Sequence, residues 1–401
     1  MSAILQLTDP ASVGLSSDGL ARVDAMIAEQ IDARQLAGAV VLVARHGKIA
    51  HFEAMGLKTL ATGEPLARDS IFAIFSMTKP ITAAAMMVLY DRGLWSPDDP
   101  LAKHLPEFAD VRGPEGAALD HAPTLRELLT HTAGFGYGIG LGPHDPTDAG
   151  YIAAGVWEAD NLADMARRVA SVPLAYQPGT QFRYSLSMDL QGAIIEKLSG
   201  QSLPDFMRES LFSPLGMVDT DFYVPASKQP RLTTLYHMYF GVPELTVLDH
   251  PGFRRDGKAI PKLPSGGGGL YSTAIDYARF AQMLLNKGEL DGVRVIQPKS
   301  VELMTANHLP QALIEHGFIA GAQRVGPGRG YAFNGAVFMD PELAGSPVGK
   351  GTYQWDGAAG TWFWIDPEHD LLFVGLIQRM MQEGMTPYQA ASQALIAEAI
   401  V

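Results

Sequence analysis

The segment Ser76-Met77-Thr78-Lys79 constrains this chain more than any other, and it is the only Ser-x-x-Lys in the sequence. An apolar run typical of a strand, 71–75, precedes it, and an apolar run typical of a helix, 81–90, follows it. Pro80 is compatible with the first turn of a helix and with no deeper position, so the helix must begin close to Ser76. Residues three apart share one face of a helix, and Lys79 would therefore lie beside Ser76.

This arrangement suits a serine hydrolase that uses an amine as its base in place of histidine. Ser76 would be the nucleophile, Lys79 would take up its proton, and the positive end of the helix would stabilise a developing oxyanion. An ordinary helix start, with a serine cap and a solvated lysine, contains the same four residues. Other segments must therefore decide between the two interpretations.

Charge and composition exclude several other functions. The net charge of −13 and the absence of a Lys/Arg run argue against nucleic acid and against an anionic membrane surface. No apolar stretch is long enough to span a bilayer. The chain has no cysteine, which excludes thiol catalysis and disulfides, and no basic and apolar leader is seen at its start. We expect a cytoplasmic protein.

The two ends of the chain both predict antiparallel hairpins. Runs typical of strands occupy 38–44 and 48–55 near the start, and 360–365 and 371–377 near the end. An amphipathic helix is predicted before the first hairpin, from Ser16-Ser17-Asp18 onward, and another after the last, from 387 to 400.

Between the hairpins the periodicity is mostly helical, including a helix over 188–198. We therefore predict an α+β fold, an α/β sandwich in which an antiparallel sheet is flanked by helices and carries an inserted all-α subdomain. The predicted domains are a discontinuous sheet domain, 1–75 with 255–401, and a mainly helical subdomain, 76–254, with the active site between them. The segment 233–262 has no clear period and is a candidate lid.

Tyr184 lies in a short alternating segment that begins at Pro178-Gly179 and leads into the helix over 188–198. It could be a half-buried packing residue with a solvated hydroxyl. If it lies beside Ser76 and Lys79 instead, the neighbouring ammonium would lower the pKa of the phenol, which could then exchange protons with the serine.

The segment 355–360, Trp-Asp-Gly-Ala-Ala-Gly, begins the last hairpin. Its small residues would let the backbone approach a substrate closely, and a strand-edge N–H here could be a second oxyanion donor beside that of Ser76. The alternative is an ordinary glycine-rich turn.

The remaining motifs give weaker indications of function. His131 could be a general base, but a structural role beneath the site is the stronger interpretation. Gly266–Gly269 is not followed by the Lys-Ser/Thr of a phosphate-binding loop, and no Gly-x-Ser-x-Gly occurs. The histidines show no metal-binding spacing, so we expect no metal and no cofactor.

Taken in order, six segments resemble the serine β-lactamase and penicillin-binding-protein superfamily, its class C branch, and within that branch the family VIII carboxylesterases. The segments are 76–79, 128–134 (Leu-Leu-Thr-His-Thr-Ala-Gly), 178–185, 214–220, 266–274 and 355–357. The resemblance implies Ser76 as nucleophile, Lys79 and Tyr184 as the base pair, and the N–H groups of Ser76 and Ala358 as the oxyanion hole. It also implies the β-lactamase-like fold.

Two departures from that family bear on the substrate. The second motif usually ends in an asparagine that contacts the substrate amide, whereas here it reads Tyr184-Ser185-Leu186. A cation usually begins the third motif and holds the substrate carboxylate, whereas Trp355 stands here. Each lost charge-assisted bond costs about 1.5–3 kcal/mol. We therefore expect weak recognition of β-lactams and D-Ala-D-Ala peptides.

The sequence thus predicts a carboxylesterase that hydrolyses small, mostly apolar, short-chain acyl or aryl esters through an acyl-enzyme. A β-lactamase or D-Ala-D-Ala peptidase, an acyltransferase, and a non-catalytic binding protein remain alternatives. The oligomeric state is not predicted. The expected pocket lining is Phe75, Phe135, Tyr137, Trp355 and Gly357.

Overall fold

The computed structural model describes residues 5–138, 146–239, 244–248, 257–320, 323–382 and 385–401. Its centre is an eight-stranded sheet in the order β12-β13-β14-β15-β16-β1-β2-β3, antiparallel throughout. The strands are β1 (Gly38–Arg45), β2 (Lys48–Thr59), β3 (Glu64–Pro65), β12 (Arg329–Tyr331), β13 (Ala336–Phe338), β14 (Tyr353–Asp356), β15 (Trp362–Asp366) and β16 (Leu371–Ile377).

The two ends of the chain meet in the middle of this sheet. β1 pairs with β16 from Ala39 opposite Ile377 to Arg45 opposite Leu371. The predicted hairpins are therefore neighbours in one sheet, and the expected fold class is confirmed. The short strands β12 and β13 were not predicted.

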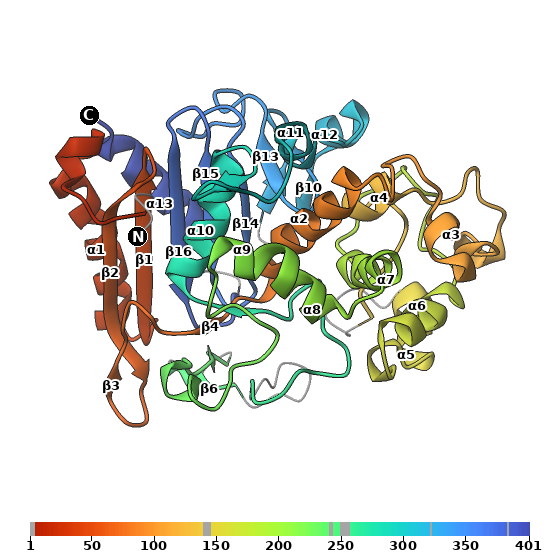
Figure 1. Ribbon diagram of the computed structural model, residues 1–401, viewed down its shortest axis with the longest axis horizontal. Helices are drawn as coiled ribbons and strands as arrows, with labels where there is room; N and C mark the ends of the chain where they lie inside the picture. Colours follow the sequence, from red (N-terminus) through yellow and green to blue (C-terminus); the bar gives the residue numbers. More distant parts are fainter. Residues whose placement is uncertain (1–4, 139–145, 240–243, 249–256, 321–322, 383–384) are drawn as a thin grey trace.

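Alternation along the strands assigns the two faces of the sheet. In β1, Ala39, Val41 and Val43 lie in an apolar cluster with α1 (Ser17–Asp32) and α13 (Tyr388–Ala399). A Cβ on Gly19 of α1 would collide with Ala399, so glycine lets these two helices pack closely. Figure 1 shows α1 at the outer side of β1 and β2.

The other face of the sheet contacts the larger core, which includes α10 (Ala274–Leu285) and α2 (Thr78–Asp91). Residues 78–89 of α2 are all buried, between the sheet side and a group of helices drawn at the right of Figure 1. The remaining helices are α3 (Leu101–His104), α4 (Leu125–Leu129), α5 (Pro146–Ala153), α6 (Leu162–Ala170), α7 (Ser187–Ser199), α8 (Leu203–Met207), α9 (Ser213–Leu215), α11 (Pro298–Thr305) and α12 (Gln311–His316).

One of four two-stranded ladders positions the start of α2. β4 (Phe72–Ala73) pairs with β7 (Tyr271–Ser272), which places the segment before Ser76 against the segment that follows the glycine run 266–269. The other pairs are β5 (Tyr236–His237) with β6 (Thr246–Val247), β8 (Glu289–Leu290) with β9 (Val293–Arg294), and β10 (Phe318–Ala320) with β11 (Gln323–Val325).

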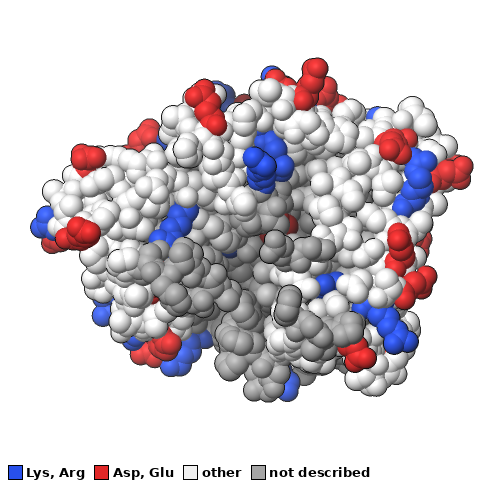
Figure 2. All heavy atoms as spheres, turned by 180° about the vertical axis from the view of Figure 1, so that it is seen from behind, with Lys and Arg blue, Asp and Glu red and all other residues white. Residues whose placement is uncertain are grey.

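The candidate lid 233–262 lies partly outside the described residues, and its described part includes β5 and β6. Its closure over the site stays a prediction, as do the predicted domain boundaries. Within the described residues, no helix combines the length and apolarity needed to cross a membrane. The face in Figure 2 carries acidic and basic side chains interspersed, most of them toward its edges.

Candidate active site

Ser76 lies in a single tight turn, Phe75–Met77, that leads directly into α2. Phe75 has a φ of +43°, a left-handed conformation that is costly for a bulky side chain. This strained residue turns the chain from β4 into the helix and leaves Ser76 half-buried between buried neighbours. The N–H of Ser76 has no hydrogen-bond partner among the described residues, so it is available to an oxyanion.

Lys79 has no exposed surface and lies directly beneath Ser76. Its Nζ donates to Ser76 Oγ at 3.1 Å and to the carbonyl oxygen of Gly267 at 2.6 Å. The same Nζ is 4.6 Å from the ring centre of Tyr184. The structure therefore brings the three predicted catalytic residues together.

Glycine at residue 267 lets the backbone pass close to the carboxylate of Asp189. A Cβ at this position would lie 3.5 Å from Lys79 Nζ and 2.9 Å from Asp189 Oδ2. The buried carboxylate of Asp189 in turn accepts from the Ser265 hydroxyl at 2.6 Å and from the Gly267 N–H at 3.3 Å. The glycine run thus brings a carbonyl to the amine, which explains it without any phosphate.

Tyr184 corrects one sequence-based expectation. Burial raises the pKa of its phenol well above the ordinary value, although the Ser76 hydroxyl and the indole of Trp355 both act to lower it. The prediction of a lowered pKa was wrong because it counted the nearby ammonium and not the loss of water around the ring. Tyr184 therefore keeps its proton at neutral pH.

His131 holds the segment that carries Tyr184. Its Nδ1 accepts from the Ser185 N–H at 3.1 Å, so Nε2 carries the ring proton, and its ring centre is 4.7 Å from that of Tyr184. Burial, and then the charge of Lys79, hold the pKa of His131 well below its usual range. This arrangement agrees with the structural role that the sequence favoured.

Ala358 lies in the turn that joins β14 to β15. A Cβ on Gly357 would collide with the carbonyl oxygen of Ile74 and with Thr361 Oγ1, so this turn packs directly on the residue that precedes Phe75. The Ala358 N–H has no partner among the described residues. This packing is consistent with the Ala358 N–H as a second oxyanion donor, which remains a prediction.

The predicted pocket lining falls into two groups. Phe75, Phe135 and Trp355 have at most 5% of their surface exposed, and Phe135 packs edge-on against Phe108 in the core. Their contact with a substrate stays a prediction. Tyr137 is half-buried and stacks on the ring of Tyr184, with a centroid distance of 5.8 Å.

Three further residues were not found from the sequence. Trp157 stacks on Tyr137 at 5.9 Å, with an angle of 16° between the ring planes. Asn334, fully buried, donates to the carbonyl oxygen of Lys79 at 3.0 Å and exchanges two hydrogen bonds with Gln191. A lone Trp, Asn or Gln far along the chain gives no local signal of such contacts.

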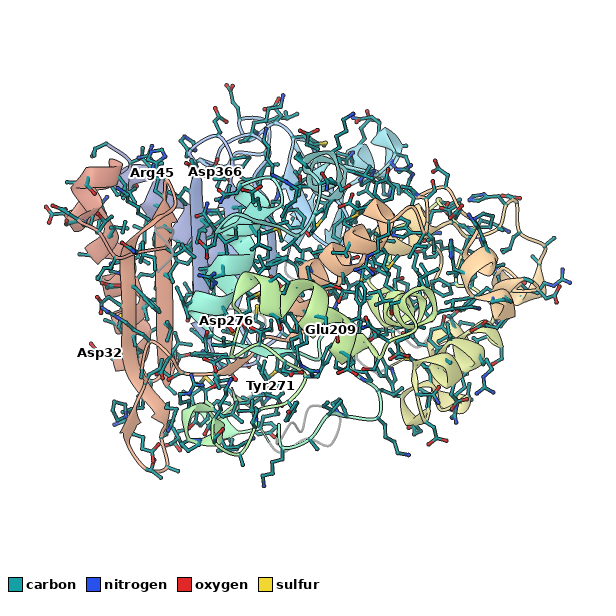
Figure 3. The ribbon with its side chains drawn as sticks, viewed as in Figure 1. Asp32, Arg45, Glu209, Tyr271, Asp276 and Asp366 are labelled. Atoms are coloured by element: carbon teal, nitrogen blue, oxygen red, sulfur yellow. The ribbon has the colours of Figure 1, made fainter. Side chains whose placement is uncertain are left out.

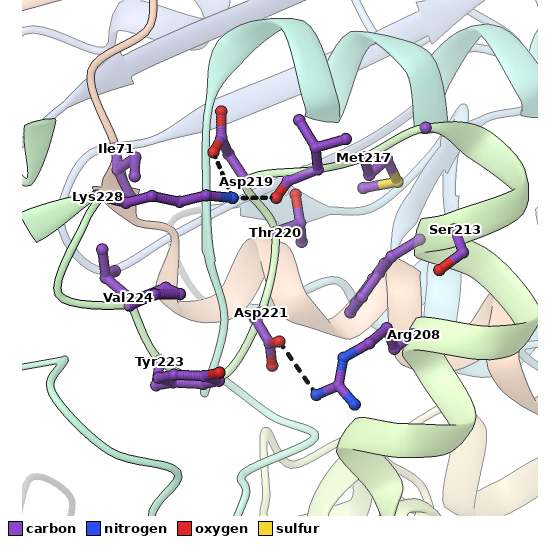
Figure 4. Close-up of a pocket in the computed structure, with 14 residues that line it drawn as sticks. Ile71, Arg208, Ser213, Met217, Asp219, Thr220, Asp221, Tyr223, Val224 and Lys228 are labelled. Atoms are coloured by element: carbon purple, nitrogen blue, oxygen red, sulfur yellow. Dashed lines mark hydrogen bonds and ion pairs between the residues drawn. The ribbon is translucent and has the colours of Figure 1, made fainter.

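A separate pocket of about 290 Å³ is lined by Ile71, by residues between 208 and 213 where α8 continues into α9, and by the segment 216–228 (Figure 4). In it, Lys228 pairs with Asp219 at 2.8 Å and Arg208 with Asp221 at 3.1 Å. The three predicted catalytic residues are not among its lining residues. Because the charges of these two pairs are satisfied there, the geometry around Ser76 is the better candidate for a catalytic site.

Comparison with known proteins agrees with this geometry. The sequence model of the family described as Beta-lactamase matches residues 23–398. Protein Rv1367c of Mycobacterium tuberculosis (strain ATCC 25618 / H37Rv) is 37% identical over 88% of both chains. Esterase EstB of Burkholderia gladioli is 34% identical over 94% of this chain and 95% of its own.

Among solved structures, the chain is similar to EstCE1, described as a hydrolase with promiscuous acyltransferase activity. The TM-score is 0.81, with 28% identity over 95% of this chain and 99% of that one. The esterases among these relatives support a serine hydrolase for this chain.

Proposed function

Because this chain belongs to the Beta-lactamase family, we propose that it is a serine carboxylesterase that hydrolyses small, mostly apolar, short-chain esters. The observation that carries the proposal is the position of Lys79 Nζ, between Ser76 Oγ and the carbonyl oxygen of Gly267. An amine fixed in hydrogen-bond reach of a serine hydroxyl is the arrangement that makes the serine a nucleophile.

In the proposed acylation step, Lys79 as the free amine takes the Ser76 proton while Oγ attacks the ester carbonyl. The N–H groups of Ser76 and Ala358 bind the oxyanion. When the tetrahedral intermediate collapses, the bond to the alcohol breaks and the departing oxygen takes a proton from Tyr184. The ammonium of Lys79 restores the proton of Tyr184 and becomes an amine again. Because burial raises the pKa of Tyr184, the phenol is protonated when the alcohol leaves and therefore has a proton to pass to it.

Deacylation repeats these steps with water as the nucleophile. Water approaches the acyl carbonyl from the Tyr184 side and passes a proton to the base pair as it attacks. The Ser76 oxygen leaves, takes that proton back, and the carboxylic acid is released. The free serine and the amine are then restored.

The second and third motifs favour neutral substrates. Leu186 is fully buried, and its apolar side chain can form no hydrogen bond with a substrate amide. Its backbone N–H already donates to the carbonyl oxygen of Gly136 at 3.1 Å. Trp355 brings no cation to hold a carboxylate. β-Lactam hydrolysis is therefore proposed only as a weak side activity.

Hydrolysis of p-nitrophenyl butyrate by the wild type and by Ser76→Ala tests the proposal. We expect turnover that the substitution abolishes. Turnover that survives in Ser76→Ala would show that the nucleophile is wrong. If neither protein turns over the ester, a fluorophosphonate that also fails to label Ser76 would revive the non-catalytic binding protein.

Acyl transfer is a second candidate, favoured by the similarity to EstCE1. The same acyl-enzyme would pass its acyl group to an alcohol or an amine in place of water. Adding an alcohol to the assay distinguishes the two, because a transferase forms the new ester at the expense of the free acid.

A further inference from the structure

Two half-buried aromatic rings stand next to the candidate catalytic group. Tyr137 stacks on Trp157, with ring centres 5.9 Å apart, and on Tyr184, with ring centres 5.8 Å apart, and its own ring centre is 5.8 Å from Lys79 Nζ. The indole N–H of Trp157 donates to the carbonyl oxygen of Tyr137 at 2.9 Å. The pair Tyr137–Trp157 is therefore joined by stacking and by a hydrogen bond. We call it the aromatic wall.

The backbone at Tyr137, one of the two residues of the aromatic wall, is held by the carboxylate of Asp148 at the start of α5. Asp148 Oδ1 accepts from the N–H of Tyr137 at 2.9 Å and from the N–H of Gly138 at 3.1 Å. Its other oxygen, Oδ2, accepts from the guanidinium of Arg183 at 2.8 Å. Asp148 is only 8% exposed, so these bonds form largely out of water.

Arg183 is the residue directly before Tyr184. Its backbone N–H donates to the carbonyl oxygen of His131 at 2.9 Å, which fixes the segment that also carries Tyr184. One carboxylate thus joins the backbone of Tyr137 to the side chain of Arg183, the residue directly before Tyr184.

Gly136 shows how closely this contact is built. A Cβ at residue 136 would collide with Asp148 Oδ1, so the chain can approach the carboxylate only as glycine. An asparagine at 148 would fill the same space, but its NH₂ group would face either the two backbone N–H groups or the guanidinium of Arg183. The site therefore requires two acceptor oxygens at residue 148, which a carboxylate provides and an amide does not.

We propose that Asp148 is a positioning residue that holds the aromatic wall in place, and that this wall selects esters with a planar aryl group. The proposal rests on the ester hydrolysis proposed above and names its substrate class. Flat rings gain from stacking on a fixed aromatic surface, whereas a saturated ring of the same size cannot lie flat on it.

The test compares two matched substrate pairs, phenyl acetate with cyclohexyl acetate and methyl benzoate with methyl cyclohexanecarboxylate. For each enzyme we take the ratio of kcat/KM for the aromatic ester to kcat/KM for the saturated ester of the same pair. The two esters differ in intrinsic reactivity, but that difference is the same for every variant and cancels when a variant is compared with the wild type. We expect Tyr137→Leu to lower one of the two ratios about three- to tenfold. Asp148→Asn should lower the same ratio, with a larger effect on KM than on kcat.

Two controls separate positioning from general loss of structure. Asp366→Asn changes a buried carboxylate that accepts from the N–H of Gly349 at 2.7 Å and pairs with the ring of His369 at 2.8 Å, at the end of β15 opposite the Ala358 turn, and should leave both ratios unchanged. In a Tyr137→Leu background, Asp148→Asn should change the ratio no further, because it acts through Tyr137. If Asp148→Asn does not fold, Arg183→Lys breaks the same link with the charge kept.

An unchanged ratio in folded Asp148→Asn, or a further shift in the Tyr137→Leu background, would overturn the role of Asp148. Unchanged ratios in Tyr137→Leu would overturn the wall itself. If the wild type hydrolyses no ester, the proposed function fails, but the aromatic wall can still be tested. Calorimetry then gives the ratio of the affinities for phenylboronic acid and cyclohexylboronic acid, which requires no turnover. A wild type that binds neither acid overturns both.

Discussion

Lys79 is the single residue on which the proposed chemistry depends most, since it is fully buried and touches the Ser76 hydroxyl. We expect Lys79→Ala to lower kcat for p-nitrophenyl butyrate by about 10²–10⁴-fold, the usual contribution of a general base. Thermal unfolding followed by circular dichroism should show that the variant remains folded. Near-normal turnover in the folded variant would contradict the assignment of Lys79.

Tyr184 makes a second prediction at this scale. Tyr184→Phe keeps the ring and removes the proton donor, so kcat should fall by about 10²-fold or more. Burial raises the pKa of the Tyr184 phenol in the folded protein. Any stability that the protonated phenol contributes is therefore fully present below the ordinary tyrosine pKa. It is lost only as the pH rises through the pKa of the folded state. Wild type and Tyr184→Phe should therefore show the same dependence of stability on pH between pH 6 and 9. Phenolate absorption at pH 8 in the wild type alone would contradict this.

Single residues also show what the sequence could and could not predict. Ser76, Lys79 and Tyr184 stand in local contexts that can be read directly, namely a helix start and a turn before a helix. Trp157 and Asp148 act through contacts made only after folding, with Tyr137 and with its backbone N–H. No local pattern marks such residues, and the sequence analysis did not find them.

At the scale of elements, prediction succeeded where periodicity or capping was strong. α1 begins after Ser16, whose hydroxyl accepts from the N–H of Gly19 at 3.2 Å, and α7 ends at Gly200, which has a φ of +72°. The strands β12 and β13 have three residues each, too few for an alternation to be recognised. β12 pairs with β13 and β13 pairs with β14, and these pairings form only in the folded chain.

Asp276 at the start of α10 makes a prediction about stability (Figure 3). Burial raises its pKa from 3.8 to about 6. Hydrogen bonds from the Asp219 N–H at 2.7 Å and the Thr220 hydroxyl at 2.9 Å act to lower this pKa but do not outweigh burial. The folded state therefore favours the protonated acid, and stability falls as pH rises from about 4 to 6. Relative to Asp276→Asn, the wild type should lose up to about 3 kcal/mol over this range. Urea unfolding at each pH measures it.

Asp219 is the matched control, with the opposite sign. Its hydrogen bond to Arg231 is the largest cause that lowers its pKa, and Lys228 adds to it. The stability it contributes is present above the unfolded pKa and is lost as pH falls through the folded pKa. Asp219→Asn should therefore be less stable than the wild type at pH 7, and the gap should narrow below pH 4. If the stability difference from the wild type changed with pH in the same direction for Asp276→Asn and Asp219→Asn, burial would not be the cause of the raised pKa of Asp276.

At the scale of the whole molecule, the site is assembled from four segments that are far apart in the chain. Ser76 and Gly267 meet because β4 pairs with β7, and the turn that carries Ala358 packs on Ile74. The segment of Tyr184 is held by hydrogen bonds to His131. The sheet formed from both ends of the chain was predicted from the hairpin patterns at those ends, and the family was predicted from the order of the six motifs. The distances within the site follow from tertiary packing and could not be predicted.

The net charge of −13 makes a prediction that belongs to the molecule as a whole. A negatively charged ester should be repelled, so p-nitrophenyl hemisuccinate should have a lower kcat/KM than p-nitrophenyl butyrate. The gap should narrow as salt screens the repulsion. Steady-state kinetics at low and high ionic strength measure it. A preference for the anionic ester that weakens with salt would point instead to a cation in the site.

The most direct test of the account is to trap the acyl-enzyme. The protein is mixed with p-nitrophenyl butyrate, quenched in acid within the first turnovers, digested, and analysed by mass spectrometry. The account predicts a butyryl group on the peptide that contains Ser76, absent from Ser76→Ala. A butyryl group on another residue that persists in Ser76→Ala, together with continued turnover, would contradict it.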